Sequence, residues 1–376
     1  MRYTGANHMI SMPIGYLIPA LLVLLSVYFI VAPPSWPRPF KFWWVFAAVV
    51  NELPLFAVLL LVASSALAIS EGDIYSPGGW IAFGFNVASI IGLIVLFCLS
   101  LQTAPVIRRA FREGLGGDWS NRLDSKLAER LDKNFSAEAL LGPFFIRSAR
   151  VQHIRNIPYG NAGQYHTLDI YHNKSRPTRS PIFIHIHGGA LRTGKKDHDA
   201  LPVVYHLAKH GWVCISANYR LQPYVSFDEQ VNDIRQVVAW TRAHGGEYGG
   251  DPDFIMLGGG SSGGQLAAMT GLEPGSVNAV VALYGQFFYG PPNEAPITYI
   301  TKDTPPFLLI HGDHDNLVPV VGTREFAQKL RSVSKNPVVY AELPHAEHNF
   351  DQFNSVRSLA TANAIESFGA WVRSIR

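Results

Sequence analysis

Three long apolar runs in the first 105 residues constrain the fold more than any other feature of the sequence. They cover residues 14–32, 42–70 and 80–103, and the first and third contain no charged side chain. A helix needs about 20 consecutive apolar residues to cross a bilayer. A cleaved signal peptide would account for the first run alone. The sequence therefore predicts an all-α transmembrane region over residues 1–105, with about three helices.

The second run differs from the others because polar residues interrupt it. Asn51 and Glu52 lie within it, and Pro54 follows them closely. A proline inside a helix removes a backbone hydrogen bond and breaks or kinks the helix. We expect a single span over residues 42–70. The alternative is a short re-entrant piece followed by a helix, with the break at Pro54.

Basic residues beside the spans predict the orientation of the chain. They gather in the loop 33–41 and in the segment 108–112, which lie on the same side of the bilayer if there are three spans. The opposite side carries Arg2 and the acidic loop 71–73. Lys and Arg are enriched in cytoplasmic loops. We therefore expect a multi-pass integral membrane protein with its C-terminal domain in the cytoplasm.

Residues 106–150 form a polar, amphipathic segment between the apolar runs and the rest of the chain. Leu123, Leu127 and Leu131 recur every four residues, which is typical of one apolar helix stripe. Residues 136–145 resemble a second short helix that ends at a Gly-Pro pair. Two interpretations stay open, a linker packed on the main domain and a lid over an active site.

Short apolar runs alternate with helical patterns from residue 151 to residue 376. Such alternation predicts an α/β domain with a mostly parallel sheet and helices on both faces. Strands are expected within residues 166–172, 181–189, 212–219, 254–260, 277–285, 306–313 and 337–344. In sheets of this kind, reactive groups gather beyond the carboxyl ends of the strands.

The stretch GGGSSGG follows one of these strands and precedes a helical pattern. It fits the pattern G-x-S-x-G twice, with either Ser261 or Ser262 at the centre. In that motif a serine sits on a tight turn between a strand and a helix. Gly259 and Gly263 would give the clearance that the turn requires. The pattern itself does not separate the two serines, and a flexible Gly/Ser linker is the alternative.

A serine nucleophile needs a base, and the base needs a carboxylate to orient it. Asp313 and Asp315 follow one strand, and His345 and His348 follow the next. The order Ser…Asp…His is the chain order of α/β-hydrolases. After another strand, the stretch HIHGGA offers backbone N–H groups that could hold an oxyanion.

These motifs together resemble one family. HGGA, ANYRLQP, the GGGSSGG turn, PPFLLIHGDHDNLVP and AEHNF occur in the order found in α/β-hydrolases of the bacterial hormone-sensitive-lipase-like carboxylesterase family, especially actinobacterial ones. The resemblance implies Ser261 as nucleophile, Asp315 as acid and His348 as base. It also implies an oxyanion hole made by Gly188, Gly189 and the N–H of Ser262, with no metal or organic cofactor.

Three residues depart from the family pattern. Ala190 stands in place of the third glycine of H-G-G-G, Gly260 in place of an acidic residue before the nucleophile, and Ser262 in place of an alanine. None of these departures removes a member of the expected triad. The pair His185 and His187 could bind a metal, but no third ligand with a convincing spacing accompanies it.

The resemblance implies a membrane-anchored serine carboxylesterase or lipase that acts through an acyl-enzyme on Ser261. A bilayer beside the pocket suggests a hydrophobic ester, such as an acyl lipid, as substrate. An amidase or formamidase with the same triad and a non-catalytic membrane scaffold are the alternatives. The net charge of only +3 indicates no nucleic-acid partner, and the sequence does not indicate an oligomeric state.

Overall fold

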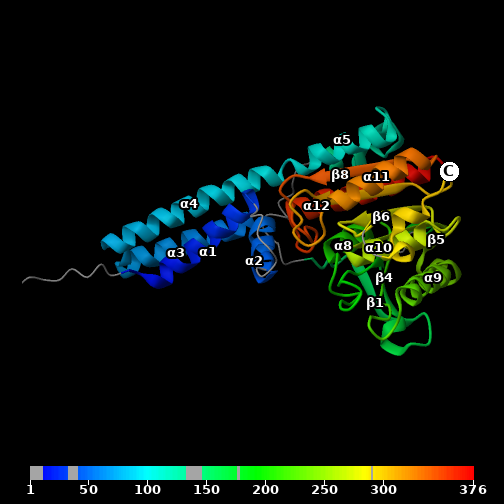
Figure 1. The fold of residues 1–376 in the computed structure, drawn as a ribbon, viewed down its shortest axis with the longest axis horizontal. Helices are drawn as coiled ribbons and strands as arrows, with labels where there is room; N and C mark the ends of the chain where they lie inside the picture. The colour runs from blue at the N-terminus through cyan, green and yellow to red at the C-terminus, as the bar shows by residue number, and fades with distance from the viewer. Residues whose placement is uncertain (1–11, 33–40, 133–145, 176–177, 289–290) are drawn as a thin grey trace, which may run out of the picture. The chain divides into compact units, whose positions relative to one another are not determined.

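The computed structural model describes residues 12–32, 41–132, 146–175, 178–288 and 291–376. The chain divides into two compact units, Met1–Ser100 and Leu101–Arg376. The first contains helices, and the second contains the sheet (Figure 1).

The described helices of the first unit are α1 (Ile14–Val31), α2 (Lys41–Glu52), α3 (Pro54–Glu71), η1 (Asp73–Tyr75) and α4 (Pro77–Ser100). The expected second span is therefore two helices that meet at Leu53, because Pro54 begins a new helix at the position where proline is tolerated. With 12 residues, α2 is about 18 Å long and too short to cross a bilayer. Within the part of the chain that the structure describes, three helical stretches are long and apolar enough to do so, Ile14–Val31, Pro54–Glu71 and Pro77–Leu115.

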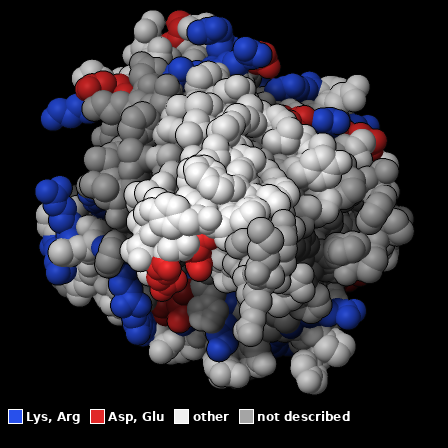
Figure 2. Space-filling model, turned by 90° about the vertical axis from the view of Figure 1, so that its left-hand side faces the viewer, with Lys and Arg blue, Asp and Glu red and all other residues white. Residues whose placement is uncertain are grey.

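Polar groups of this unit face other helices, while large apolar side chains face outward. Ser89 Oγ on α4 donates to the carbonyl of Ala20 on α1 at 2.8 Å. Tyr16 on α1 and Ser65 on α3 share a hydrogen bond of 2.9 Å. The outward side chains that are more than half exposed include Leu59, Leu60, Leu67 and Ile91. The view toward these helices is largely free of charged groups at its centre, apart from one acidic cluster (Figure 2). Apolar side chains on the outside and hydrogen-bonded polar groups between the helices are the distribution expected for helices in lipid.

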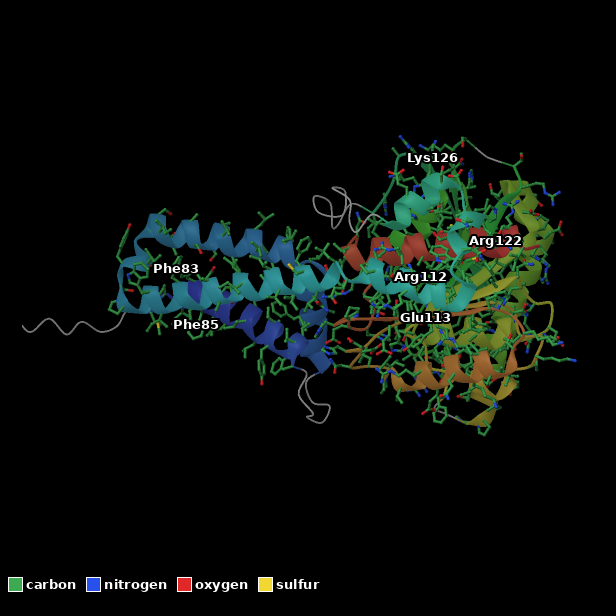
Figure 3. All side chains as sticks on the ribbon, turned by 90° about the horizontal axis from the view of Figure 1, so that it is seen from above. Phe83, Phe85, Arg112, Glu113, Arg122 and Lys126 are labelled. Atoms are coloured by element: carbon green, nitrogen blue, oxygen red, sulfur yellow. The ribbon has the colours of Figure 1, made fainter. Side chains whose placement is uncertain are left out.

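Charged side chains become frequent after the third apolar run. Phe83 and Phe85 on α4 contrast with Arg112 and Glu113 on α5 (Thr103–Leu115), and further charges follow along the chain (Figure 3). The change in composition coincides with the division between the units after Ser100.

The second unit contains an eight-stranded sheet with the order β1-β2-β4-β3-β5-β6-β7-β8. Its strands are β1 (Val151–Pro158), β2 (Thr167–Asn173), β3 (Ser180–Ile186), β4 (Val213–Ala217), β5 (Gly250–Gly260), β6 (Ala279–Leu283), β7 (Phe307–Gly312) and β8 (Val338–Leu343). Strand β2 pairs antiparallel with both of its neighbours, and all pairs from β4 to β8 are parallel. The mostly parallel sheet expected from the sequence is confirmed, and β1 is an edge strand that the sequence did not predict.

Helices cover both faces of this sheet. The apolar core on one face includes residues of α5, α8 and α12, and the core on the other includes residues of α9, α10 and α11. The helices are α6 (Ser125–Asp132), α8 (Leu201–Lys209), α9 (Phe227–His244), α10 (Ser262–Gly271), α11 (Val321–Val333) and α12 (Val356–Ser374). Short 3-10 helices are η2 (Trp119–Arg122), η3 (Gly163–His166), η4 (Gly245–Tyr248), η5 (Pro292–Glu294) and η6 (Pro296–Tyr299). Side chains alternate between the faces, as Phe183 and Ile184 of β3 do.

Residues 106–150, for which the sequence allows a linker or a lid, begin within a helix that packs in the core of the second unit. Ile107 and Phe111 of α5 are fully buried. A Cβ added to Gly114 would lie 2.7 Å from the carbonyl oxygen of Val338, so α5 lies directly against β8. Helix α6 contacts α12. This packing favours the linker interpretation for α5 and α6, while the second short helix expected at residues 136–145 lies outside the described residues.

Candidate active site

The GGGSSGG stretch is a tight turn between β5 and α10. Ser261 joins them with φ +56° and ψ −126°, a conformation that residues with a side chain rarely adopt. A Cβ on Gly259 would lie 2.7 Å from the carbonyl carbon of Gly263, and one on Gly263 would lie 2.1 Å from the oxygen of Ile186. The glycines therefore provide the clearance expected from the sequence, and the stretch is not a flexible linker.

The two serines have different surroundings. Ser262 is the first residue of α10 and is buried, and its Oγ accepts a hydrogen bond from the N–H of Leu191 at 3.2 Å. Ser261 is partly exposed and occupies the strained centre of the turn. Backbone strain of this kind is typical of the nucleophile position in G-x-S-x-G turns. The geometry thus separates the two registers that the sequence pattern allows, in favour of Ser261.

One carboxylate and one imidazole form a close pair at the carboxyl ends of β7 and β8. Nδ1 of His348 lies 2.6 Å from Oδ2 of Asp315. The other oxygen, Oδ1, accepts from the N–H groups of Leu317 and Val318 at 2.9 and 2.8 Å. These bonds fix the carboxylate in its loop, and the imidazole is held through Nδ1 with Nε2 directed away from it.

The alternative pair suggested by the sequence has a different role. Oδ1 of Asp313 accepts a hydrogen bond from the backbone N–H of His345 at 2.6 Å. The His345 ring packs edge-on against His314, with ring centroids 4.5 Å apart. Asp313 therefore holds the loop after β8, and the side chains of Asp313 and His345 do not replace the Asp315–His348 pair.

Asp315 has a second imidazole partner that sequence reasoning missed. Nε2 of His311, on β7, lies 3.0 Å from Oδ2 of Asp315, and its Nδ1 lies 2.6 Å from Oγ1 of Thr323. Burial acts to raise the pKa of Asp315, but hydrogen bonds from His311 and His348 and their charges together lower that pKa to about 2. The signal was available, because His311 precedes Asp315 by four residues at a strand end.

Tyr284 connects the serine turn to the histidine. A Cβ added to Gly260 would lie 2.5 Å from the Tyr284 hydroxyl oxygen, and the Tyr284 and His348 ring centroids are 4.6 Å apart. The hydroxyl donates to Oδ1 of Asp351. Burial first, and then the charge of Asp351, raises the pKa of Tyr284, so the phenol stays protonated. Tyr284 explains the departure at Gly260, since a larger residue there would collide with the ring.

The loop after β3 lies beside Ser261. A Cβ on Gly188 would be 3.1 Å from Cβ of Ser261. The N–H of Gly188, however, donates to Oδ2 of Asp199 at 2.8 Å. The expected role of Gly188 as an oxyanion donor is therefore corrected, because its single N–H is already used. Asp199 stands eleven residues further along the chain, where no sequence motif marks it.

The other two expected oxyanion donors remain available to that role. Gly189 has φ +123°, and a Cβ there would lie 2.1 Å from the oxygen of Thr193, so only glycine fits. The N–H of Ser262 is in the first turn of α10, where helix N–H groups have no intrahelical acceptor. The bond from Leu191 to Ser262 Oγ holds the loop against the start of α10.

The HIH pair has structural roles in this arrangement. Nδ1 of His185 lies 3.1 Å from Oγ of Ser216. Nδ1 of His187 lies 2.7 Å from the oxygen of Gly188, and the His187 carbonyl accepts from the Tyr219 hydroxyl at 3.0 Å. Burial lowers the pKa of His187 to about 4, which keeps the ring neutral. The two histidines thus support the loop beneath the site.

A separate group of residues could hold a metal ion. Among the described residues it consists of His206, His210 and Glu366, on or next to α8 and α12. It includes none of the residues of the serine turn, the Asp315–His348 pair or the loop after β3.

Known proteins with sequences similar to this chain include ester hydrolases. The BD-FAE family model matches residues 168–286 and 292–330. The probable carboxylic ester hydrolase LipM of Mycobacterium tuberculosis is 33% identical over 377 residues, covering 88% of this chain and 86% of that protein. Esterase LipC of the same organism is 33% identical over 267 residues, covering 59% of this chain and 66% of that protein.

Solved structures share the fold of the second unit. A truncated carbohydrate esterase from gut microbiota superposes with a TM-score of 0.52 at 22% identity, covering 58% of this chain and 96% of that chain. Butyrate-bound esterase 2 of Thermogutta terrifontis gives a TM-score of 0.51 at 23% identity, covering 59% and 92%. At such identities the likeness concerns the fold alone.

Proposed function

The chain belongs to the hormone-sensitive-lipase-like family of bacterial carboxylesterases and is a carboxylic ester hydrolase, and from this premise we propose that it acts as a membrane-anchored serine esterase through an acyl-enzyme on Ser261. The observation that carries this proposal is the 2.6 Å bond between His348 and Asp315, at the same sheet edge as the strained turn of Ser261. A serine, an imidazole and a carboxylate in that order are the parts that nucleophilic acyl transfer requires.

The proposed reaction has two steps. Oγ of Ser261 attacks the ester carbonyl while Nε2 of His348 takes the hydroxyl proton, and His348 then gives this proton to the leaving alcohol. In the second step His348 takes a proton from water, the resulting hydroxide attacks the acyl-enzyme, and the proton returns to Ser261. Asp315 keeps the tautomer with its proton on Nδ1 and stabilises the imidazolium that forms in each step.

We propose that the N–H groups of Gly189 and Ser262 stabilise the oxyanion, with that of Ala190 replacing Gly188. The bond between Leu191 and Ser262 Oγ supports this assignment, because it holds residues 189–190 close to the start of α10. Donors that are fixed before the reaction stabilise the developing charge without reorganisation. No metal or organic cofactor takes part in these steps.

Anchoring in a bilayer is supported by the first unit. Its helices carry exposed large apolar side chains and form hydrogen bonds between one another. The likeness to LipM covers more of the chain than the second unit alone provides, so it extends into the first hundred residues. The basic residues near 38–41 and 108–112 support a cytoplasmic location for the catalytic unit. A C-terminal reporter that works only in the cytoplasm should be active, and one that works only outside the cytoplasm should be inactive. Activity of the second reporter and not of the first would refute this orientation.

A bilayer next to the catalytic unit favours a hydrophobic ester, such as an acyl lipid, as substrate. The test is a chain-length series of chromogenic esters, with matching anilides, assayed on full-length protein in detergent and in vesicles. We expect hydrolysis of esters over anilides, activity that continues to long acyl chains, and loss of activity in Ser261→Ala. Turnover confined to short soluble esters would refute the lipid substrate, and a preference for anilides would indicate an amidase.

A further inference from the structure

Three side chains with metal-binding atoms meet between α8 and α12. Nε2 of His206 lies 3.0 Å from Oε2 of Glu366, Nδ1 of His210 lies 3.4 Å from the same oxygen, and the two ring nitrogens are 3.1 Å apart. We propose that His206, His210 and Glu366 bind a zinc ion that fastens α8 to α12.

The triangle formed by these atoms has the size of a metal-binding face. Bonds of about 2.0–2.1 Å to zinc, spread at tetrahedral angles, place neighbouring ligand atoms about 3.3 Å apart. The three separations of 3.0, 3.1 and 3.4 Å lie close to this value. A small inward or outward movement of each side chain would therefore admit the ion, and no change of backbone is required.

Hydrogen bonding among the three atoms has one arrangement without conflict, in which His206 Nε2–H donates to Glu366 and Nδ1 of His210 is an acceptor. If both rings donated to the same oxygen of Glu366, their two N–H groups would face each other across 3.1 Å. If one ring donated to the other, the second nitrogen would be left 3.4 Å or less from the carboxylate as an acceptor beside an acceptor. A cation at the centre uses all three atoms in another way, because each of them then presents a lone pair to it.

The positions of the ligands favour zinc over calcium or magnesium. His206 is on α8, and His210 follows four residues later at the end of the helix, a spacing that puts two histidines on one helix face, as in known zinc sites. Glu366, on α12, supplies a carboxylate that is 6% exposed. Calcium and magnesium prefer oxygen ligands, whereas zinc accepts two imidazoles and a carboxylate. The side chain of His210 is 23% exposed, which leaves a path for water as fourth ligand.

The zinc would act on the fold and not on the ester. Both helices pack on the same face of the sheet, and Glu366 stands ten residues after the start of α12, about 15 Å along the helix. Helix α8 begins two residues after Asp199, whose carboxylate holds the Gly188 N–H. An ion that joins α8 to α12 thus stabilises the support of the loop beside Ser261 without touching the reacting atoms.

The experiment uses full-length protein purified in detergent through a tag without histidines, stripped with a chelator and desalted. Zinc content per chain and thermal midpoint are measured before and after addition of zinc, with calcium and magnesium as comparison ions. Cobalt is added as a spectroscopic substitute, because tetrahedral cobalt absorbs strongly in the visible range. The variants are His206→Ala and the nearly isosteric Glu366→Gln. His244→Ala is the matched control, since His244 is a partly exposed histidine on α9 that pairs with Glu247.

We expect wild-type protein and His244→Ala to retain one more zinc per chain than either site variant. In excess zinc the thermal midpoint of wild type should rise by roughly 5 °C or more, because an ion that binds only the folded state stabilises it by mass action. Both site variants should lose the rise and the cobalt spectrum. Calcium and magnesium should have no effect.

Two outcomes would overturn the proposal. One is equal zinc retention by wild type and Glu366→Gln in samples that hydrolyse a short chromogenic ester equally well, since both are then folded. The other is a bound zinc that leaves the thermal midpoint of wild type unchanged. Either result leaves the esterase proposal intact, because the site shares no residue with Ser261, Asp315 or His348.

Discussion

His348 and Asp315 are joined by a 2.6 Å contact between Nδ1 and Oδ2, although each has a neighbour of the same type two or three residues away. The neighbours are used elsewhere, because Asp313 accepts from the backbone of His345. Of the four candidate side chains, only those of Asp315 and His348 are therefore paired with each other. His311 contacts the same carboxylate oxygen, Oδ2, whereas the loop amides of Leu317 and Val318 donate to the other oxygen, Oδ1.

Asp315→Asn should lower kcat by about 10³-fold or more, because an amide no longer favours the tautomer that leaves Nε2 of His348 free to accept a proton. Asp313→Asn is the matched control and should stay within about tenfold of wild type, since an amide oxygen still accepts from the His345 N–H. Steady-state kinetics on a soluble chromogenic ester measure both. Equal losses in the two variants would contradict the assignment of Asp315.

Ser262→Ala should lower kcat/KM by about 5–30-fold, which corresponds to the 1–2 kcal/mol expected when the N–H of Leu191 loses its acceptor. The effect should appear mainly in kcat, because the loop beside the oxyanion loosens while the substrate pocket is kept. Ser261→Ala should remove at least 10³-fold under the same conditions. A larger loss in Ser262→Ala than in Ser261→Ala would show that the register of the turn is wrong.

Gly260→Ala should lower both activity and thermal midpoint. The added Cβ would lie 2.5 Å from the hydroxyl oxygen of Tyr284, whose ring packs against His348, so the collision moves the base away from the serine turn. We expect kcat to fall by at least about tenfold. Gly246→Ala is the matched control, because nothing lies within 4 Å of a Cβ added there. Wild-type kinetics in Gly260→Ala would refute the role given to Tyr284.

Glu347 should make the folded protein less stable as the pH rises. Burial first, and then the charge of Asp315, raises its pKa from 4.5 to about 8. Between these values the folded state binds more protons than the unfolded state, so the free energy of unfolding falls as pH increases from about 4.5 to 8. Glu347→Gln, which keeps an acceptor for Asn316, should show a smaller fall.

The measurement for Glu347 is the thermal midpoint in detergent between pH 5 and pH 8. Asp315 provides the opposite trend at lower pH, because its lowered pKa makes stability fall as pH drops from about 3.8 to 2. Parallel curves for wild type and Glu347→Gln between pH 5 and pH 8 would show that Glu347 ionises normally in the folded protein.

The sequence predicted the sheet and the serine turn because both depend on local patterns. Alternating apolar strands and helices define a mostly parallel sheet, and the glycines flanking Ser261 define a tight turn after β5. Strand β1 was missed because its residues lack the continuous apolar run of the buried strands: only Val151 within Val151–Pro158 is buried. The second apolar run was expected as one span, and its division at Leu53 follows from a single proline.

The partners of single polar atoms could not be predicted. Whether the N–H of Gly188 is available depends on the carboxylate of Asp199, which reaches it only after the loop has folded. The contact of Tyr284 with both Gly260 and His348 likewise joins three segments far apart in the chain. The order of the motifs predicted which residues belong to the site. Which of their atoms form hydrogen bonds or contacts depends on how the loops fold.

The clearances at Gly259 and Gly263 have a consequence for how such proteins change over evolution. Neither residue can gain a carbon atom without colliding with the backbone of Ile186, whether or not the neighbouring serine reacts. A descendant that lost its chemistry would no longer need a hydroxyl at residue 261, yet it would have to keep both glycines to fold. The glycines are required by the backbone geometry of the turn, whereas the serine is required by the reaction. A homologue that keeps both glycines but has no serine between them is therefore expected to have lost the esterase activity.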